Sequence, residues 1–278
     1  MTTLEFSLLL CAGSFAAGLV GALTGLGGGV VLVPLLTLLF KVDIHYAIGA
    51  SLVSVIATSS GAAAAYVREG LSNIRIGMFL EIATTLGAIF GAHLASHVST
   101  HAIAIVFGIV LLFSASFSRR SRLNPLRPEP PDSLATRLRL NGQFPDAGST
   151  RNYNVQHVPA GWGLMFVAGS LSGLLGIGSG AMKVLAMDQA MKIPFKVSTT
   201  TSNFMIGVTA AASAGIYLKH GYIDPGLSMP VMLGVLGGSL LGARILVNAR
   251  PKWLRLGFAI VIAALGIEML YNGIAGRL

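Results

Sequence analysis

The sequence predicts an all-α integral membrane protein built from two inverted repeats of about five helical segments each, with short broken or re-entrant helices after glycine-rich turns. Three observations support this fold class. Only 10% of the 278 residues are charged, apolar runs long enough to cross a bilayer recur along the chain, and the two halves match at a constant shift. Soluble domains carry about 25% charged residues. A surface with so few charges must face lipid.

The net charge of +9 does not indicate nucleic acid, because of where the basic residues lie. Seven of the nineteen Lys and Arg residues fall within residues 119–151, and most of the others lie at the ends of apolar runs. This is typical of a protein oriented by an anionic cytoplasmic leaflet. We therefore expect the lipid bilayer as a partner and no nucleic acid. The single Cys11 has no cysteine partner for a disulfide, and the sequence suggests no metal site.

Runs of apolar residues mark the predicted membrane segments. They are residues 6–23, 44–67, 76–96 and 102–116 in the first half, and 161–175, 197–218, 227–247 and 254–271 in the second. A shorter piece follows the first run of each half, at residues 30–40 and 181–191. Each is too short to span about 30 Å of hydrocarbon comfortably. Both crossing and re-entry remain open for these pieces.

The polar stretch between the halves is the only long one. We assign residues 1–116 to the first membrane repeat, 117–159 to a polar cytoplasmic linker and 160–278 to the second membrane repeat. The Pro and Arg content of the linker predicts little order. A short interfacial helix at residues 134–140 is the exception that we expect.

An internal repeat becomes visible when the sequence is shifted by 151 residues. The halves then align without a gap from about residue 17 to residue 110. The matched pairs are Gly25/Gly176, Gly27/Gly178, Gly29/Gly180, Lys41/Lys192, Ser51/Ser202, Thr58/Thr209, Tyr66/Tyr217, Gly87/Gly238 and Gly91/Gly242. We expect the GxxxG pairs at 87–91 and 238–242 to pack helices.

Basic residues in short loops predict the orientation. With the Arg-rich linker inside, the loop at 68–75 falls inside and the loop at 97–101, which has no Lys or Arg, falls outside. The repeat-mate of this outside loop, at 250–255, carries basic residues and falls inside. Equivalent loops with opposite charge bias are what inverted repeats require. Five or three crossings per half both give this inversion.

Two glycine-rich clusters, residues 25–29 and 176–180, interrupt membrane segments that would otherwise be continuous. Glycine lets the backbone unwind and lets a ligand approach closely. The short segments after these turns would begin inside the membrane with free N–H groups, which favour an anion. Close helix packing on small residues is the alternative. Recurrence of the cluster before a short segment in both halves favours the anion site.

Residues 25–34 read Gly-Leu-Gly-Gly-Gly-Val-Val-Leu-Val-Pro, and residues 47–52 read Ala-Ile-Gly-Ala-Ser-Leu. With both repeats, these motifs resemble the TauE/SafE family, also called sulfite exporters or the toluene-sulfonate uptake permease group. The linker lies outside the resemblance. The second repeat departs from the motif by placing Ser179, Lys183 and Leu185 opposite Gly28, Leu32 and Pro34. The resemblance implies transport of sulfite, sulfonates or related small organic anions across the bacterial inner membrane.

Charged and hydroxyl side chains in the membrane segments complete the candidate site. Lys183 would add a positive charge one turn into the second short segment, and Glu81 is a candidate for proton coupling. Placement at a membrane interface is the alternative for both residues. Hydroxyls suit sulfonate or sulfite oxygens, although membrane helices also use them to pack. The predicted substrate-binding residues are Gly27, Gly28, Gly29, Ser51, Gly178, Ser179, Gly180, Lys183, Ser202 and Asn203.

The sequence therefore predicts a secondary transporter that moves a small anion by alternating access. A passive anion channel is the first alternative. A rhomboid-like serine hydrolase at Ser179 is a remote one, because His220 is the only histidine after Ser179 and falls in a predicted loop. We expect no enzyme activity and no cofactor, since no Walker motif is present and the cluster at 25–30 lacks the last glycine of a dinucleotide fingerprint. A homodimer is a further candidate assembly.

Overall fold

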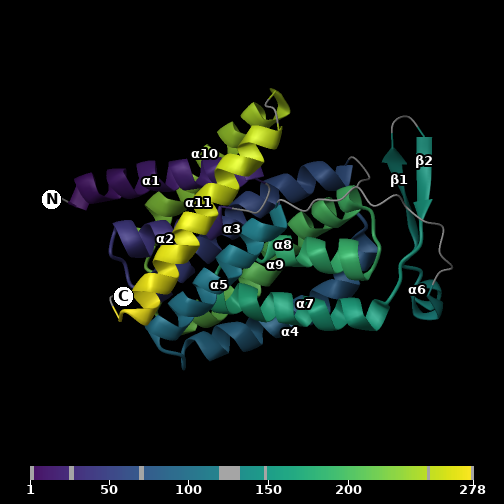
Figure 1. Cartoon of the computed structure of the whole chain (residues 1–278), viewed down its shortest axis with the longest axis horizontal. Coiled ribbons are helices and arrows are strands. Elements are labelled where there is room, and N and C mark those ends of the chain that lie inside the picture. The colour runs from purple at the N-terminus through teal and green to yellow at the C-terminus, as the bar shows by residue number, and fades with distance from the viewer. Residues whose placement is uncertain are drawn as a thin grey trace.

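The computed structural model describes residues 3–24, 28–68, 72–118, 132–146, 149–248 and 251–276. Within these ranges it contains eleven α-helices, two π-helical segments and one two-stranded sheet. Most of the long helices run along the length of the molecule, and the sheet lies at one end of them (Figure 1). The chain is mostly helical, as predicted.

The helical elements of the two halves follow each other in the same order. The first half contains α1 (Thr3–Thr24), α2 (Gly29–Pro34), η1 (Leu35–Leu39), α3 (Ile44–Arg68), α4 (Ile74–Ala95) and α5 (Thr100–Ser118). The second half contains α7 (Val158–Leu175), α8 (Gly180–Leu185), η2 (Ala186–Ala190), α9 (Phe195–Lys219), α10 (Pro225–Asn248) and α11 (Pro251–Ile274). In the described ranges α1, α4, α7 and α10 are long and apolar enough to cross a membrane. These four helices are two pairs of repeat-mates.

Each short segment returns the chain to the end where the preceding helix began. The ring of Phe6, near the start of α1, lies 6.2 Å from the ring of Phe40, which follows η1. In the second half Gly161, near the start of α7, contacts Met191 after η2, and the Gln156 N–H donates to the Met191 carbonyl at 3.1 Å. Each short segment therefore folds back along the helix before it and forms a hairpin with that helix, an arrangement that favours re-entry over crossing.

Equivalent helices run in opposite directions where they cross. Gly49 near the start of α3 lies against the Tyr222 carbonyl just after α9, and Ser59 farther along α3 lies against Gly207. The helices α5 and α11 also run antiparallel, with Gly108 beside Gly266. The first helix of each half packs on the fourth helix of the other half, α1 on α10 and α7 on α4.

Glycines make the close contacts between α4 and α7. A Cβ on Gly87 would meet the Phe166 carbonyl, and one on Gly91 would meet the Ser170 carbonyl. On α10, a Cβ on Gly238 would meet the Phe15 carbonyl of α1. Only glycine permits this backbone approach. The packing role expected for the GxxxG glycines is confirmed at these three positions.

Each short segment, α2 with η1 and α8 with η2, changes from α-helix to π-helix after six residues. Pro34 precedes η1, and proline lacks the N–H that an α-helix uses. Its repeat-mate Leu185 has that N–H, yet η2 still begins at the equivalent residue, Ala186. Proline is therefore not what produces the π-helical turn. Such turns occur often at functional sites.

The second part of the linker is folded, and the prediction of little order is wrong there. Residues 132–157, which we call the linker module, contain α6 (Ser133–Arg137), β1 (Gly142–Asp146) and β2 (Ser149–Tyr153), paired antiparallel. The predicted short helix is α6. The module buries apolar side chains against α4, η2 and α9; they are Ala135, Leu140, Phe144, Tyr153 and Val155. The composition of the whole linker did not indicate this apolar face, because most of its prolines and arginines lie within residues 119–131, before the module begins.

Candidate functional site

The turns of the two hairpins meet inside the helical body. A Cβ on Gly29 would lie 3.0 Å from the Gly176 carbonyl oxygen. Val55 of α3 would contact a Cβ on either Gly29 or Gly178. The structure thus brings the two predicted clusters together. Gly27 lies outside the described residues.

The two turns have different backbone conformations. Gly176 and Gly178 adopt φ values of +67° and +68°, and Ser179 adopts +43°. Gly28, the repeat-mate of Ser179, adopts a right-handed φ of −63°. The left-handed region favours glycine, so a serine at that position is unusual.

The predicted hydroxyl donors are used unequally. Ser51 donates to the Gly176 carbonyl at 2.7 Å, which ties α3 to the opposite turn, and Ser202 donates to the Gly180 carbonyl at 3.2 Å. Asn203 is half-buried beside Ser202 on α9. Ser179 differs, because its Oγ is buried and has no hydrogen-bond partner among the described residues. Buried polar groups normally have a partner, so this hydroxyl is the one available to a ligand.

A chain of hydrogen-bonded side chains, two of them charged, lies next to the second turn. The Lys183 side chain is fully buried, and its Nζ donates to Thr209 Oγ1 of α9. The Thr209 hydroxyl in turn donates to Glu81 Oε1 of α4 at 2.7 Å, and Thr85 donates to the same oxygen at 3.1 Å. The chain joins α8, α9 and α4 and balances one buried positive charge with one negative charge.

Sequence reasoning selected Lys183 and Glu81 separately and missed Thr209. The signal that could have identified Thr209 was its match to Thr58 in the repeat alignment. Lys183 lies four residues after Ser179, and its N–H donates to the Ser179 carbonyl at 3.0 Å. Ser179 and Lys183 thus lie one turn of backbone apart, at the start of α8.

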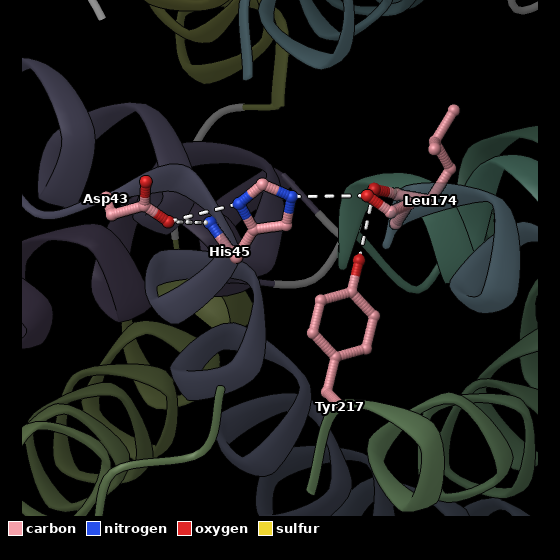
Figure 2. A network of polar contacts seen from close by, with 5 residues as sticks. Asp43, His45, Leu174 and Tyr217 are labelled. Carbon is pink, nitrogen blue, oxygen red and sulfur yellow. Dashed lines mark hydrogen bonds and ion pairs between the residues drawn. The ribbon is translucent and has the colours of Figure 1, made fainter. Parts of the chain in front are cut away.

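Tyr217 of α9 supports the second turn from the side. Its buried hydroxyl donates to the Gly173 carbonyl at 3.1 Å, and Figure 2 shows it also pointing to Leu174 at the end of α7. Figure 2 further shows His45 at the start of α3 with Asp43 as its partner. His45 stacks on Tyr222, which ties α3 to the loop between α9 and α10.

Most of the chain matches the family model described as Sulfite exporter TauE/SafE, over residues 10–269. The chain belongs to the TauE/SafE family. It is 30% identical to the Bacillus subtilis (strain 168) protein named "Probable membrane transporter protein YunE", over 98% of this chain and 99% of that protein. A second B. subtilis relative, "Probable membrane transporter protein YdhB", is 28% identical over 86% and 89% of the two chains.

The relatives of this TauE/SafE protein extend to another bacterium. A "Probable membrane transporter protein" of Xylella fastidiosa (strain 9a5c) is 23% identical over 96% of each chain. No solved structure matches the chain. With its apolar helices, family membership makes the protein a multi-pass membrane transporter and not an enzyme. His220 is the histidine that a serine hydrolase at Ser179 would require. Its Nδ1 contacts the Ile216 carbonyl of its own helix.

The candidate residues of this TauE/SafE transporter are enclosed by protein. Lys183 is 0% exposed, Ser179 3% and Glu81 8%. A ligand can reach these groups only if surrounding helices separate. The structure therefore represents a closed conformation of the candidate site.

Proposed function

We propose that this protein carries a small oxyanion, such as sulfite, a sulfonate or a related organic anion, across the bacterial inner membrane by alternating access. The observation that carries the proposal is that α8 holds a buried lysine, Lys183, one turn of backbone after Ser179, whose buried hydroxyl has no partner among the described residues. A cation and a free donor at the meeting point of two hairpins suit an anion. The family description adds sulfite as a candidate substrate.

The anion would lie between the two turns, on the side of the Ser179 hydroxyl. Gly28 and Gly29 are closely packed in this conformation, since a Cβ on Gly28 would lie 3.0 Å from Val235 Cγ1, so the turns would have to move apart to admit the anion. Ser51 and Ser202 hold backbone carbonyls of the second hairpin, so we assign them to shaping the site. Asn203 and Gly180 stay candidates for contact with the anion. All these residues come from one chain, so the site needs no second copy.

Glu81 would couple transport to protons. Its carboxylate balances Lys183 through Thr209, and among the described residues of α4, α7, α8, η2 and α9 no other charged side chain joins this chain of hydrogen bonds. An incoming anion competes with Glu81 for the ammonium group. Protonation of Glu81 removes that competing charge, so anion and proton would bind together.

Alternating access would follow from inverted repeats related by a pseudo-two-fold axis in the membrane plane, with the linker in the cytoplasm. The antiparallel crossings of α3 with α9 and of α5 with α11 support this arrangement. Lys41 and Lys192 are exposed repeat-mates with nearly equal φ values of +55° and +56°. After Cys11→Ser, a cysteine at 192 should react only from the cytoplasmic side and one at 41 only from outside. Reaction of both from one side would refute the inversion.

Proteoliposome uptake tests the proposed activity. A panel of sulfite, sulfonates and carboxylates, each with and without a pH gradient, should show saturable uptake of at least one anion by the parent protein. Lys183→Gln should abolish it, whereas the exposed control Lys192→Gln should retain it. Glu81→Gln should transport without responding to the pH gradient. Uptake that does not saturate and shows no counterflow would identify a channel, and no flux for any anion would refute the proposal.

A further inference from the structure

A polar pocket lies where the linker module meets the ends of α4 and α9, apart from the transport site. It has a volume of about 280 Å³. Figure 1 shows the module at the end of the molecule that lies beyond the start of α7. The lining residues combine the start of α4, the module and one residue of α9; they include Ser72, Arg75, Arg139, Asn141, Gln143 and Val197.

The charged residues that line this pocket, within the part of the chain that the structure describes, are both arginines. Arg75 comes from the first turn of α4, and Arg139 follows α6 in the linker module. No aspartate or glutamate is among the described lining residues. Within the described ranges neither guanidinium group forms a salt bridge. Two cations from separate elements, without a balancing carboxylate, leave a field that favours an anion.

Neutral donors add to the two guanidinium groups. The Oγ of Ser72 is buried and has no hydrogen-bond partner among the described residues. The first N–H groups of α4 have no partner within the helix. Asn73 satisfies only one donor of the first turn, by accepting from the Ile76 N–H at 3.1 Å. Forked guanidinium groups with hydroxyl and backbone N–H donors match the oxygens of a phosphate or sulfate.

We propose that this pocket binds a tetrahedral oxyanion, either as a free phosphate or sulfate ion or as the phosphate of an anionic lipid headgroup. The bound group bridges Arg75 of α4 to Arg139 of the linker module. It thereby fastens the module to the membrane helices.

The position of the pocket gives such binding a regulatory consequence. Asn73 connects three parts of the molecule, because its N–H donates to Thr201 of α9 at 3.1 Å and its side chain donates to the Tyr153 hydroxyl of β2 at 2.7 Å. The helices α4 and α9 also carry Glu81 and Thr209, which hold Lys183. An oxyanion that fastens the module to the start of α4 strengthens the connection that Asn73 makes to α9, and so opposes the helix separation that opens the transport site.

Binding to the purified full-length protein tests the proposal. Titration calorimetry with inorganic phosphate and with sulfate, at constant ionic strength, measures the free-ion arm. Nanodiscs of phosphatidylglycerol and of phosphatidylcholine measure the lipid arm, through the difference in thermal midpoint. Arg75→Gln and Arg139→Gln alter the pocket. Arg137→Gln is the matched control, because Arg137 is exposed on α6 and does not line the pocket.

The parent protein should bind phosphate or sulfate, or be stabilised by phosphatidylglycerol, and the double variant should lose about tenfold or more in affinity or lose the lipid effect. Arg137→Gln should match the parent. Equal thermal midpoints of parent and double variant without the anion would show that both are folded. No response of the parent to either arm, or an equal loss in Arg137→Gln, would overturn the proposal.

Discussion

The two hairpins, each made of a short segment and the helix before it, share their architecture. They differ in the side chains of their short helices and of the helices packed against these. Behind α8, Lys183 is joined through Thr209 to Glu81. The repeat-mates of these residues are Leu32 and Thr58 in the first half and Met232 in the second. Leu32 is fully buried, and the Thr58 hydroxyl donates to the Ser54 carbonyl of its own helix at 3.0 Å. The repeat-mates of the two charged residues are thus both apolar.

Only one of the two similar hairpins packs against a charged chain of side chains. The comparison therefore distinguishes the features that hold the fold together from those that serve transport. The glycine contacts and π-helical turns recur in both halves and therefore serve the hairpin itself. The charges occur once, behind the second hairpin, which is also the hairpin whose end is tied to the linker module through Gln156 and Met191. The anion and its coupling proton are expected to belong to the second hairpin.

The largest expected effect comes from replacing the charged residues by their repeat-mates. Lys183→Leu leaves the Glu81 carboxylate buried without its counter-charge and should destabilise the protein by about 3–5 kcal/mol. The double variant Lys183→Leu with Glu81→Met should regain most of that stability but no transport. Thermal midpoints and proteoliposome uptake measure the two effects, with Lys192→Leu as control. A single variant as stable as the parent would contradict the charge pairing.

The glycines that begin the two short helices should also respond differently. A Cβ on Gly29 would meet Ser51 Oγ at 2.7 Å and the Gly176 carbonyl at 3.0 Å, whereas one on Gly180 would meet only the flexible end of Ile206 closely, at 2.7 Å. Gly29→Ala should therefore cost about 1–3 kcal/mol, and Gly180→Ala clearly less. Unfolding measured side by side checks the order. A larger loss in Gly180→Ala would show that the turns are not packed as described.

Replacing Ser179 with glycine, the residue of the first hairpin, separates binding from stability. Glycine tolerates the left-handed φ of +43°, so folding should be unchanged or improved. Loss of the hydroxyl should raise the KM for the transported anion about tenfold, as for a hydrogen bond to a charged group. Ser172→Ala, another buried serine whose Oγ has no partner among the described residues, is the control. An unchanged KM in Ser179→Gly would remove this hydroxyl from the site.

The helices and the repeat could be predicted because apolar run length and alignment register are properties of the sequence itself. The Lys183–Thr209–Glu81 chain could not, since Thr209 and Glu81 are 128 residues apart and meet only through the packing of α4 on α9. The alignment also places Ser179 opposite Gly28, yet Ser179 is left-handed and Gly28 is right-handed. Conformation at a turn depends on its surroundings, which alignment does not supply.

The contact of the linker module with the second hairpin is a further difference between the two hairpins. The variant Tyr153→Phe tests how the module is attached, and its expected effect is the smallest. Tyr153→Phe removes the acceptor of the Asn73 amide and should cost about 1 kcal/mol. Burial raises the pKa of Tyr153 above 10.0, because it disfavours the phenolate, although the hydrogen bond from Asn73 lowers it in part. The stability that this raised pKa contributes is present below pH 10 and is lost as the pH rises through the pKa of the folded state. The difference in thermal midpoint between parent and Tyr153→Phe should therefore shrink from pH 8 to pH 11. A constant difference across this range would mean that folding does not raise the pKa of Tyr153.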